Sequence, residues 1–304
     1  MSPALRLPKP TATVRAGRAR LRFYSGDCVE LLTRIDPGSV DVIVTSPPYN
    51  LGVQYRSYDD RLPGDRYLRW TNEWVAATAR VLTGTGSLFL NVGSTPVRPW
   101  TAFDVAAEVR HHLKLQNTIH WIKSIAIDKA LAGTRVQLQR DLAVGHYKPI
   151  NSDRFVNDCH EFIFHFTPTG RTPLDRQAVG VPYQDQSNVA RWNSVAGGIR
   201  CRGNTWFMPY ATIQSRERDR PHPATFPPLL PERCLRLHGI DRCGMVVDPF
   251  LGLGSTAVAC ARLGLDFIGI ELDLGYLREA VTRVREALLV QKNGPPKRGR
   301  KGMP

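Results

Sequence analysis

Residues 45–50 (TSPPYN) bring a hydroxyl, a carbonyl group and an aromatic ring together within one short stretch. An apolar run precedes them and predicts a buried strand, which two consecutive prolines cannot continue. Because the Pro48 ring removes an N–H group, the Pro47 carbonyl and the Ser46 hydroxyl can both accept hydrogen bonds from one exocyclic amino group. Tyr49 can stack on the base that carries this amino group. The alternative interpretation is a rigid turn with a buried tyrosine.

A second pattern lies late in the sequence, at residues 246–257 (VVDPFLGLGSTA). A predicted strand runs into a glycine-rich turn that opens a helix, as in nucleotide-binding loops. Gly252 and Gly254 allow the backbone to pass close to a ligand. Glu271 follows the next predicted strand, 23 residues beyond Asp248, where an acid can accept hydrogen bonds from both hydroxyls of a ribose.

The acid before these glycines indicates the kind of cofactor. The carboxylate of Asp248 would repel a pyrophosphate but would pair with an ammonium group. S-adenosyl-L-methionine carries an amino acid at one end and adenosine at the other, so it suits both Asp248 and Glu271. A dinucleotide dehydrogenase and an ordinary helix entry capped by Asp248 are the alternatives that these residues leave open.

Short apolar runs alternate with stretches of helical periodicity along most of the chain. This alternation predicts an α/β fold, with a mostly parallel sheet and helices on both faces. Ligands of such sheets bind at the carboxyl ends of the strands. The expected strands are 40–45, 87–92, 118–122, 161–166, 245–247 and 267–270, and the expected helices are 65–82, 100–113, 228–237, 255–263 and 276–289.

Composition narrows the class of protein further. The chain has 304 residues, of which 42% are hydrophobic, and this is enough for a sizeable core. No run of eighteen apolar residues occurs and the start of the chain does not resemble a signal peptide, so we expect a cytoplasmic protein without membrane contact. The cysteines form no C-x-x-C pair and the histidines lack partners at ligand spacing, so neither a disulfide framework nor a metal site is expected.

The net charge of +14 is concentrated at the two ends of the sequence. Residues 1–22 carry six basic side chains and residues 292–304 carry five, and neither stretch holds an acid. Such basic ends contact nucleic-acid phosphates in some proteins and merely keep others soluble.

Together, the two patterns resemble the β class of DNA amino-methyltransferases. In that class a motif of D, N or S followed by P-P and an aromatic residue comes first, a target-recognition region follows, and the cofactor loop comes last. The likeness covers about residues 21–290. It implies a Rossmann-like methyltransferase sheet of seven strands, one of them antiparallel, with circularly permuted motif order and an irregular target-recognition insertion. It also implies S-adenosyl-L-methionine as the cofactor and association with the nucleoid.

The resemblance assigns roles residue by residue. Catalysis falls to Ser46, Pro47, Pro48 and Tyr49. Cofactor binding falls to Asp27, Thr225, Asp248, Phe250, Gly252, Gly254, Ser255, Thr256 and Glu271. Asp27 matches the acid that hydrogen-bonds the adenine amino group in the family. Thr225 lies in a motif, HPATFP at residues 222–227, that departs from the commoner H-P-T-Q-K-P form.

The serine form of the catalytic motif is associated mainly with cytosine, so the resemblance implies methyl transfer to the N4 amino group of a cytosine flipped out of double-stranded DNA. Adenine N6 is the alternative target. An RNA or protein-amide methyltransferase, and a nucleic-acid-binding protein without catalysis, fit the motif order and the intact motif residues less well. Because stacking needs only an aromatic ring, Tyr49→Phe is expected to keep most of the activity, unlike Tyr49→Ala.

Target recognition is expected in residues 168–221, which hold eight arginines and no lysine. Arginine suits bidentate contacts with guanine and phosphate. The candidate DNA-binding residues are Arg176, Arg191, Arg200, Arg202, Arg216 and Arg218. The predicted division of the chain is a flexible basic arm (1–20), a catalytic half (21–167), the recognition region (168–221), a cofactor-binding half (222–291) and a flexible basic tail (292–304). A homodimer and a cognate restriction endonuclease are left open as partners.

Overall fold

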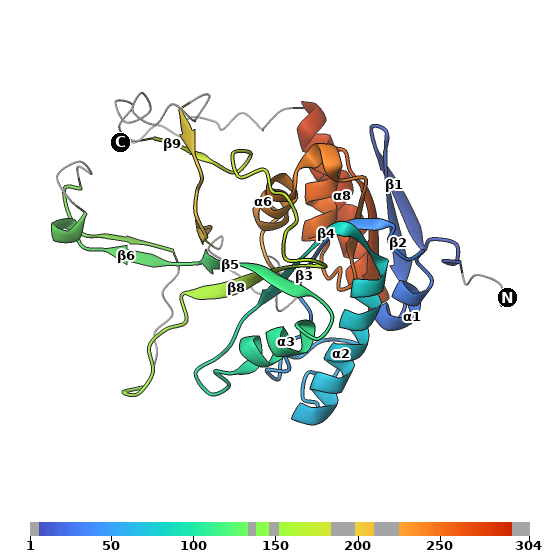
Figure 1. Ribbon diagram of the computed structural model, residues 1–304, viewed down its shortest axis with the longest axis horizontal. Helices are drawn as coiled ribbons and strands as arrows, with labels where there is room; N and C mark the ends of the chain where they lie inside the picture. The colour runs from blue at the N-terminus through green and yellow to red at the C-terminus, as the bar shows by residue number, and fades with distance from the viewer. Residues whose placement is uncertain (1–5, 133–137, 146–151, 184–197, 210–224, 294–304) are drawn as a thin grey trace, which may run out of the picture.

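The computed structural model of the protein describes residues 6–132, 138–145, 152–183, 198–209 and 225–293. One central sheet is covered by helices on both faces (Figure 1). The first face carries α1 (Cys28–Thr33), α2 (Gly64–Val81) and α3 (Thr101–Val109). The second face carries α6 (Leu229–His238), α7 (Ser255–Leu263) and α8 (Leu274–Asn293). The expected α/β architecture is therefore confirmed.

The sheet has nine strands in the order β1-β2-β13-β12-β3-β4-β8-β5-β11. Their bounds in chain order are β1 (Ala12–Ala16), β2 (Ala19–Ser25), β3 (Val40–Thr45), β4 (Leu82–Val92), β5 (Lys114–Ile122), β8 (His160–Thr167), β11 (Thr205–Phe207), β12 (Met245–Asp248) and β13 (Asp266–Glu271). The seven strands from β2 to β5 match the expected methyltransferase sheet, in which β8 runs antiparallel to both of its neighbours. The edge strands β1 and β11 extend this sheet, and β1 adds a third antiparallel pairing to the two that β8 makes.

Periodicity located the main elements to within a few residues. The helix expected at 255–263 is α7, and its two ends are flanked by glycines in the left-handed conformation, Gly254 and Gly264. The short helix α1 begins at an N-cap residue, Asp27, whose carboxylate accepts the Glu30 backbone N–H at 3.0 Å. β4 begins earlier than expected, at Leu82, and includes Gly84 and Gly86, which lie between the expected helix 65–82 and the expected strand 87–92.

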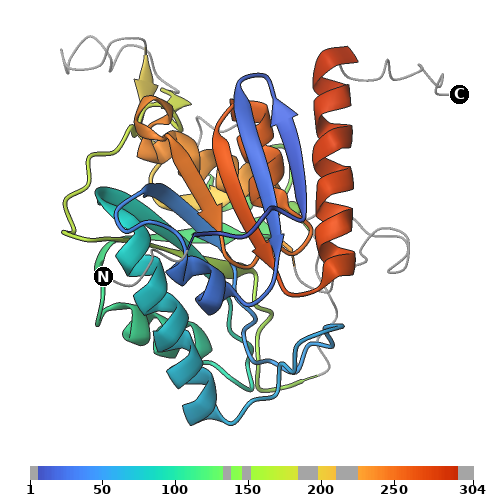
Figure 2. The same ribbon diagram turned by 90° about the vertical axis from the view of Figure 1, so that its right-hand side faces the viewer.

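The prediction of a flexible arm over residues 1–20 is wrong for its second half. Residues 12–16 form β1, which pairs antiparallel with β2 at the edge of the sheet and lies beside α8 (Figure 2). Val14 and Ala16 are buried there, because alternate residues of the strand point into the core cluster under α8. The basic residues of this stretch lie on the opposite, exposed side of the hairpin or at its ends.

The expected recognition region, 168–221, also contributes to the main domain. β11 pairs parallel with β5, and its Trp206 is 1% exposed. The same region forms the small antiparallel pair of β9 (Val181–Pro182) and β10 (Ile199–Arg200). A second small pair, β6 (Ile125–Ile127) with β7 (Leu142–Val144), extends away from the sheet (Figure 1). Two single turns of 3₁₀ helix, Lys129–Leu131 and Ile240–Arg242, complete the described elements.

Each face of the sheet has its own hydrophobic cluster. The cluster under α6, α7 and α8 includes Phe23, Val44 and Phe267, and the cluster under α1, α2 and α3 includes Ile43, Leu90 and Ile270. This division follows from the alternation of side chains along the parallel strands. Across the described ranges, no helix combines the length and apolar character that a membrane span requires.

Candidate active site

A cavity of about 1150 Å³, open solvent at its mouth included, lies at the carboxyl ends of β3, β12 and β13. Both sequence patterns contribute to its wall. The predicted site residues that line the cavity are Asp27, Ser46, Pro47, Pro48, Tyr49, Thr225, Phe250, Gly252, Ser255 and Glu271. Among the predicted catalytic and cofactor-binding residues, those that do not line the cavity are Asp248, Gly254 and Thr256.

The two patterns lie side by side because their strands are neighbours. β12 pairs parallel with β3, with Val246 opposite Val42 and Val247 opposite Ile43. The strands end together, and the Thr45 hydroxyl donates a hydrogen bond of 2.7 Å to Oδ1 of Asp248. A buried hydrogen bond therefore joins the proline corner to the glycine-rich loop.

Asp248 lies in the protein interior, where it stabilises the glycine-rich loop, and it does not face the cavity. Its side chain is 1% exposed, and its Oδ1 also accepts the backbone N–H of Phe250 at 3.1 Å. Burial raises the pKa of its carboxyl group to about 6, although the hydrogen bonds it accepts oppose this rise. The sequence predicted a contact between Asp248 and the cofactor ammonium group, whereas in the structure its carboxyl group contacts Thr45 and the Phe250 backbone and does not line the cavity.

Glu271 is the acid at the cavity wall. Its Oε2 accepts the Gly252 N–H at 2.8 Å and its Oε1 accepts the Asp273 N–H at 2.9 Å. Burial raises the pKa of Glu271 above its ordinary value, against these two hydrogen bonds. Asp27 lines the same wall, since the backbone N–H of Gly26 donates to the carbonyl of Glu271. The two acids expected to bind adenosine thus occupy adjoining positions.

Gly254 and Thr256 face the protein interior. A Cβ atom built on Gly254 would lie 2.8 Å from Cβ of Ala280, so this glycine permits close packing of the loop on α8. The Thr256 hydroxyl donates to the carbonyl of Val44 at 3.2 Å. The Ser255 hydroxyl donates to the carbonyl of Phe226 at 2.6 Å, which ties the glycine-rich loop to the segment that carries Thr225.

The proline corner presents its polar groups much as expected. The Tyr67 hydroxyl donates to the Pro48 carbonyl at 2.8 Å, whereas no donor to the Pro47 carbonyl is found within the described ranges. The Ser46 hydroxyl and the Tyr49 hydroxyl lie 2.8 Å apart in a hydrogen bond. The expectation for Tyr49→Phe considered the ring alone, and the structure shows that the hydroxyl has partners of its own.

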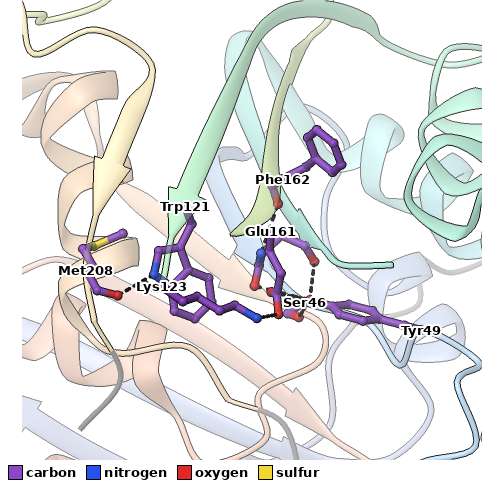
Figure 3. Close-up of polar contacts among 8 residues, drawn as sticks. Ser46, Tyr49, Trp121, Lys123, Glu161, Phe162 and Met208 are labelled. Atoms are coloured by element: carbon purple, nitrogen blue, oxygen red, sulfur yellow. Dashed lines mark hydrogen bonds and ion pairs between the residues drawn. The ribbon is translucent and has the colours of Figure 1, made fainter. Parts of the chain in front are cut away.

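Sequence reasoning missed two polar residues that contact the Tyr49 hydroxyl, Asn91 and Glu161, and the lysine paired with one of them, Lys123. This hydroxyl lies 3.3 Å from Oδ1 of Asn91. It also lies 3.3 Å from Oε2 of Glu161, which Figure 3 shows beside Tyr49. Glu161 forms an ion pair with Lys123, and both side chains are largely buried. These residues come from β4, from the start of β8 and from the residue just beyond β5, none of which belongs to either motif.

Sequence reasoning also missed an aromatic wall of the cavity. Tyr55, Tyr58 and Trp70 line it, and the Trp70 ring lies 5.6 Å from that of Phe250. The loop that carries the two tyrosines is held by Asp60, which is 1% exposed and accepts the backbone N–H groups of residues 50, 51 and 53. Its signal in the sequence was a pair of tyrosines, Tyr55 and Tyr58, a few residues after the proline corner.

The candidate DNA-binding arginines are only partly described. Arg176 and Arg200 are exposed, while Arg202 is half-buried and donates through Nε to the carbonyl of Val179 at 2.9 Å. The remaining three, Arg191, Arg216 and Arg218, lie outside the described residues. In the part of the chain that the structure describes, no group of three or more metal-ligand side chains occurs.

Comparisons with known proteins place the chain in a family. Residues 40–282 match the family described as DNA methylase, whose name, N6_N4_Mtase, covers two kinds of amino target. The type II methyltransferase M.HpaI of Haemophilus parainfluenzae is 26% identical over 263 residues, which are 86% of this chain and 74% of that protein.

Solved structures agree on the fold. The PvuII DNA methyltransferase (cytosine-N4-specific) superimposes with a TM-score of 0.61 at 18% identity, over 95% of this chain and 96% of that one. TTHA0409 of Thermus thermophilus, solved with S-adenosyl-L-methionine, gives 0.55 at 23% identity, over 88% and 94%. S-adenosyl-L-methionine as the predicted methyl donor agrees with these findings. The chain therefore belongs to the DNA methylase family, and it is a DNA amino-methyltransferase of the class that its two motifs resemble.

Proposed function

We propose that this protein transfers a methyl group from S-adenosyl-L-methionine to the N4 amino group of a cytosine flipped out of double-stranded DNA. The observation that carries the proposal is that Ser46 and Glu271 line one cavity, with their loops joined through the Thr45–Asp248 hydrogen bond. This arrangement supports a site for a nucleobase beside Ser46 and for the nucleoside of the methyl donor beside Glu271, within the same cavity.

The residues of the cavity suit this methyl donor. Glu271 is held by two backbone N–H groups, and the ribose hydroxyls of the donor would supply further donors to the same buried carboxyl group. Asp27 lies alongside for the adenine amino group. Thr225 and Ser255 line the part of the cavity next to the glycine-rich loop, where we place the methionine end. When bound, the donor supplies an electrophilic methyl group on a sulfonium ion.

The proline corner supplies what an amino nucleophile needs. The lone pair of the cytosine amino nitrogen is delocalised into the ring, so the nitrogen is a poor nucleophile. Hydrogen bonds from its two N–H groups to Ser46 and to the Pro47 carbonyl would favour a pyramidal nitrogen with its lone pair directed at the methyl group. Catalysis would then rest on positioning and on fixed acceptors.

The test is a nucleoside analysis of DNA from cells that express the protein, with Ser46→Ala as the inactive control. We expect N4-methylcytosine in the first DNA and a loss of most of it in the second. N6-methyladenine in its place would select the alternative target, and the absence of both modified bases in cells that contain the folded protein would refute the proposal. Sequencing around the modified bases gives the recognition site in the same experiment.

A further inference from the structure

A chain of hydrogen-bonded groups leads from Ser46 away from the cavity. The Ser46 hydroxyl contacts the Tyr49 hydroxyl at 2.8 Å, and the Tyr49 hydroxyl contacts Oε2 of Glu161 at 3.3 Å. Beyond Glu161, an ion pair joins this carboxylate to Lys123 (Figure 3). The Tyr49 hydroxyl also lies 3.1 Å from the backbone carbonyl of Asn91 and 3.3 Å from its side-chain oxygen.

The direction of these hydrogen bonds follows from which of the groups can donate and which can only accept. A backbone carbonyl and a carboxylate accept hydrogen bonds and cannot donate them. The Asn91 amide group also turns its oxygen toward Tyr49, because its Nδ2 donates to the Phe162 carbonyl at 3.0 Å. With three acceptor oxygens within 3.3 Å of its hydroxyl, Tyr49 is favoured as the donor to one of them. Its own oxygen is then left to accept from Ser46.

The consequence reaches the cavity. With its proton directed at Tyr49, Ser46 keeps its lone pairs for a substrate N–H group, which is the role that the proposed reaction gives it. If Glu161 could donate to Tyr49, the direction of these hydrogen bonds could reverse. Tyr49 would then donate to Ser46, and Ser46 would direct its own proton at the substrate amino group instead of accepting from it.

From this geometry we infer that Glu161, held by Lys123, is a positioning residue that fixes Ser46 as a hydrogen-bond acceptor and takes up the proton released in the reaction. This inference rests on the proposed function. The amino nitrogen forms a bond to the methyl carbon, the carbon–sulfur bond breaks with its electron pair left on sulfur, and the nitrogen becomes positively charged. One of its protons passes to Ser46, the Ser46 proton passes to Tyr49, and the Tyr49 proton passes to the Glu161 carboxylate, so a neutral methylamino group remains.

The surroundings hold Glu161 in place for this role. The side chains of Glu161 and Lys123 are 14% and 19% exposed, so the pair is partly shielded from water. The Lys123 ammonium group lies 5.1 Å from the centre of the Trp121 ring, and Trp121 donates through Nε1 to the Met208 carbonyl at 2.8 Å (Figure 3). Gly93 leaves room for the Glu161 side chain, since a Cβ atom at position 93 would lie 2.9 Å from Cγ of Glu161.

The experiment compares Glu161→Gln with the wild-type protein in methyl transfer from labelled S-adenosyl-L-methionine to genomic DNA of a host without the enzyme. Glutamine keeps the shape of the side chain but can donate to Tyr49 and cannot take up a proton. We expect kcat to fall roughly 10- to 100-fold, at the low end of general-base effects, with KM for both substrates within about twofold. Glu232→Gln, which breaks an ion pair with Arg236 on α6, is the matched control and should keep wild-type kcat.

A double-mutant cycle separates this role from a merely structural one. If Glu161 acts through Ser46, then Glu161→Gln added to Ser46→Ala should lower kcat by less than about twofold further. Equal losses in the wild-type and Ser46→Ala backgrounds would mean a structural role and would overturn the inference, as would unchanged kcat in Glu161→Gln alone.

Tyr49→Phe gives a second test that does not depend on the folding of Glu161→Gln. It keeps the aromatic ring but cuts the chain, so we expect kcat to fall at least roughly fivefold with unchanged KM, whereas stacking alone predicts nearly full activity. Full activity of Tyr49→Phe overturns the inference. A wild-type protein that transfers no methyl group to DNA would overturn the proposed function as well, so the two failures are distinguishable.

Discussion

Replacing Gly254 with alanine should destabilise the fold more than the same replacement at Gly264, although the two glycines flank the same helix. Both have left-handed backbones, with φ of +73° at Gly254 and +70° at Gly264. A new Cβ at Gly264 meets no atom within 4 Å, whereas at Gly254 it would lie 2.8 Å from Cβ of Ala280 and 3.3 Å from its Cα. The pair therefore separates the cost of backbone conformation from the cost of crowding.

The expected magnitudes follow from these contacts. The left-handed conformation costs a non-glycine residue about 1–2 kcal/mol, and this applies equally to both variants. Carbon atoms prefer a separation near 3.5–4.0 Å, so α8 would have to move by several tenths of an ångström in Gly254→Ala. Overpacking of this kind costs about 1–3 kcal/mol, which is the difference expected between the two free energies of unfolding.

Urea denaturation followed by circular dichroism measures both free energies of unfolding, and a thermal scan should place the midpoint of Gly254→Ala several degrees below that of Gly264→Ala. Calorimetric titration with S-adenosyl-L-methionine then shows whether crowding at Gly254 also distorts the cofactor loop, as we expect. Equal losses of stability in the two variants would refute the packing role and would return Gly254 to the ligand-facing role suggested by the motif.

Three further predictions follow from buried or charged groups. Because Asp248 does not line the cavity, Asp248→Asn should bind S-adenosyl-L-methionine within about threefold of the wild-type affinity. The pKa of Asp248 is raised to about 6 in the folded protein, so ionising this group costs the wild-type protein stability as the pH rises. The free energy of unfolding of Asp248→Asn, relative to that of wild type, should therefore rise by up to about 3 kcal/mol between pH 4 and pH 7. Burial lowers the pKa of His165 to about 3, so below about pH 6.5 the unfolded chain binds a proton that the folded protein does not. The free energy of unfolding of the wild-type protein should therefore fall on acidification. Denaturation curves should show a smaller fall for His165→Gln, by up to about 2 kcal/mol at pH 5. Deleting residues 294–304 removes four basic side chains, and if all four contact phosphates the slope of log K against log salt should flatten by about 3.6, whereas an unchanged slope would leave this segment a solubility tail.

The proline corner and the glycine-rich loop could be predicted from sequence because each follows directly on a parallel strand. Carboxyl ends of parallel strands share one edge of the sheet, so a motif after 40–45 and another after 245–247 had to approach one another once β3 and β12 paired. The role of Gly254 could not be predicted in the same way. The pattern shows that a residue without a side chain is needed, but the identity of the crowding atom, on Ala280 of α8, depends on tertiary packing.

The placement of Glu161 and Lys123 beside the Tyr49 hydroxyl depends on the direction of β8. A pattern of apolar residues does not reveal the direction of a strand. β8 runs antiparallel to β4 and β5, with Phe162 opposite Val92, so its first residues lie at the edge where the parallel strands end. Glu161 is the second residue of this strand. It lies opposite Trp121 in the pairing with β5, and Trp121 is two residues before Lys123. Had β8 been parallel, Glu161 would have been at the far edge of the sheet, and residues after Phe166 would have faced the cavity instead. An acid at the start of an apolar strand therefore becomes a candidate site residue when that strand is the inverted one, which is why the glutamate became visible only with the topology.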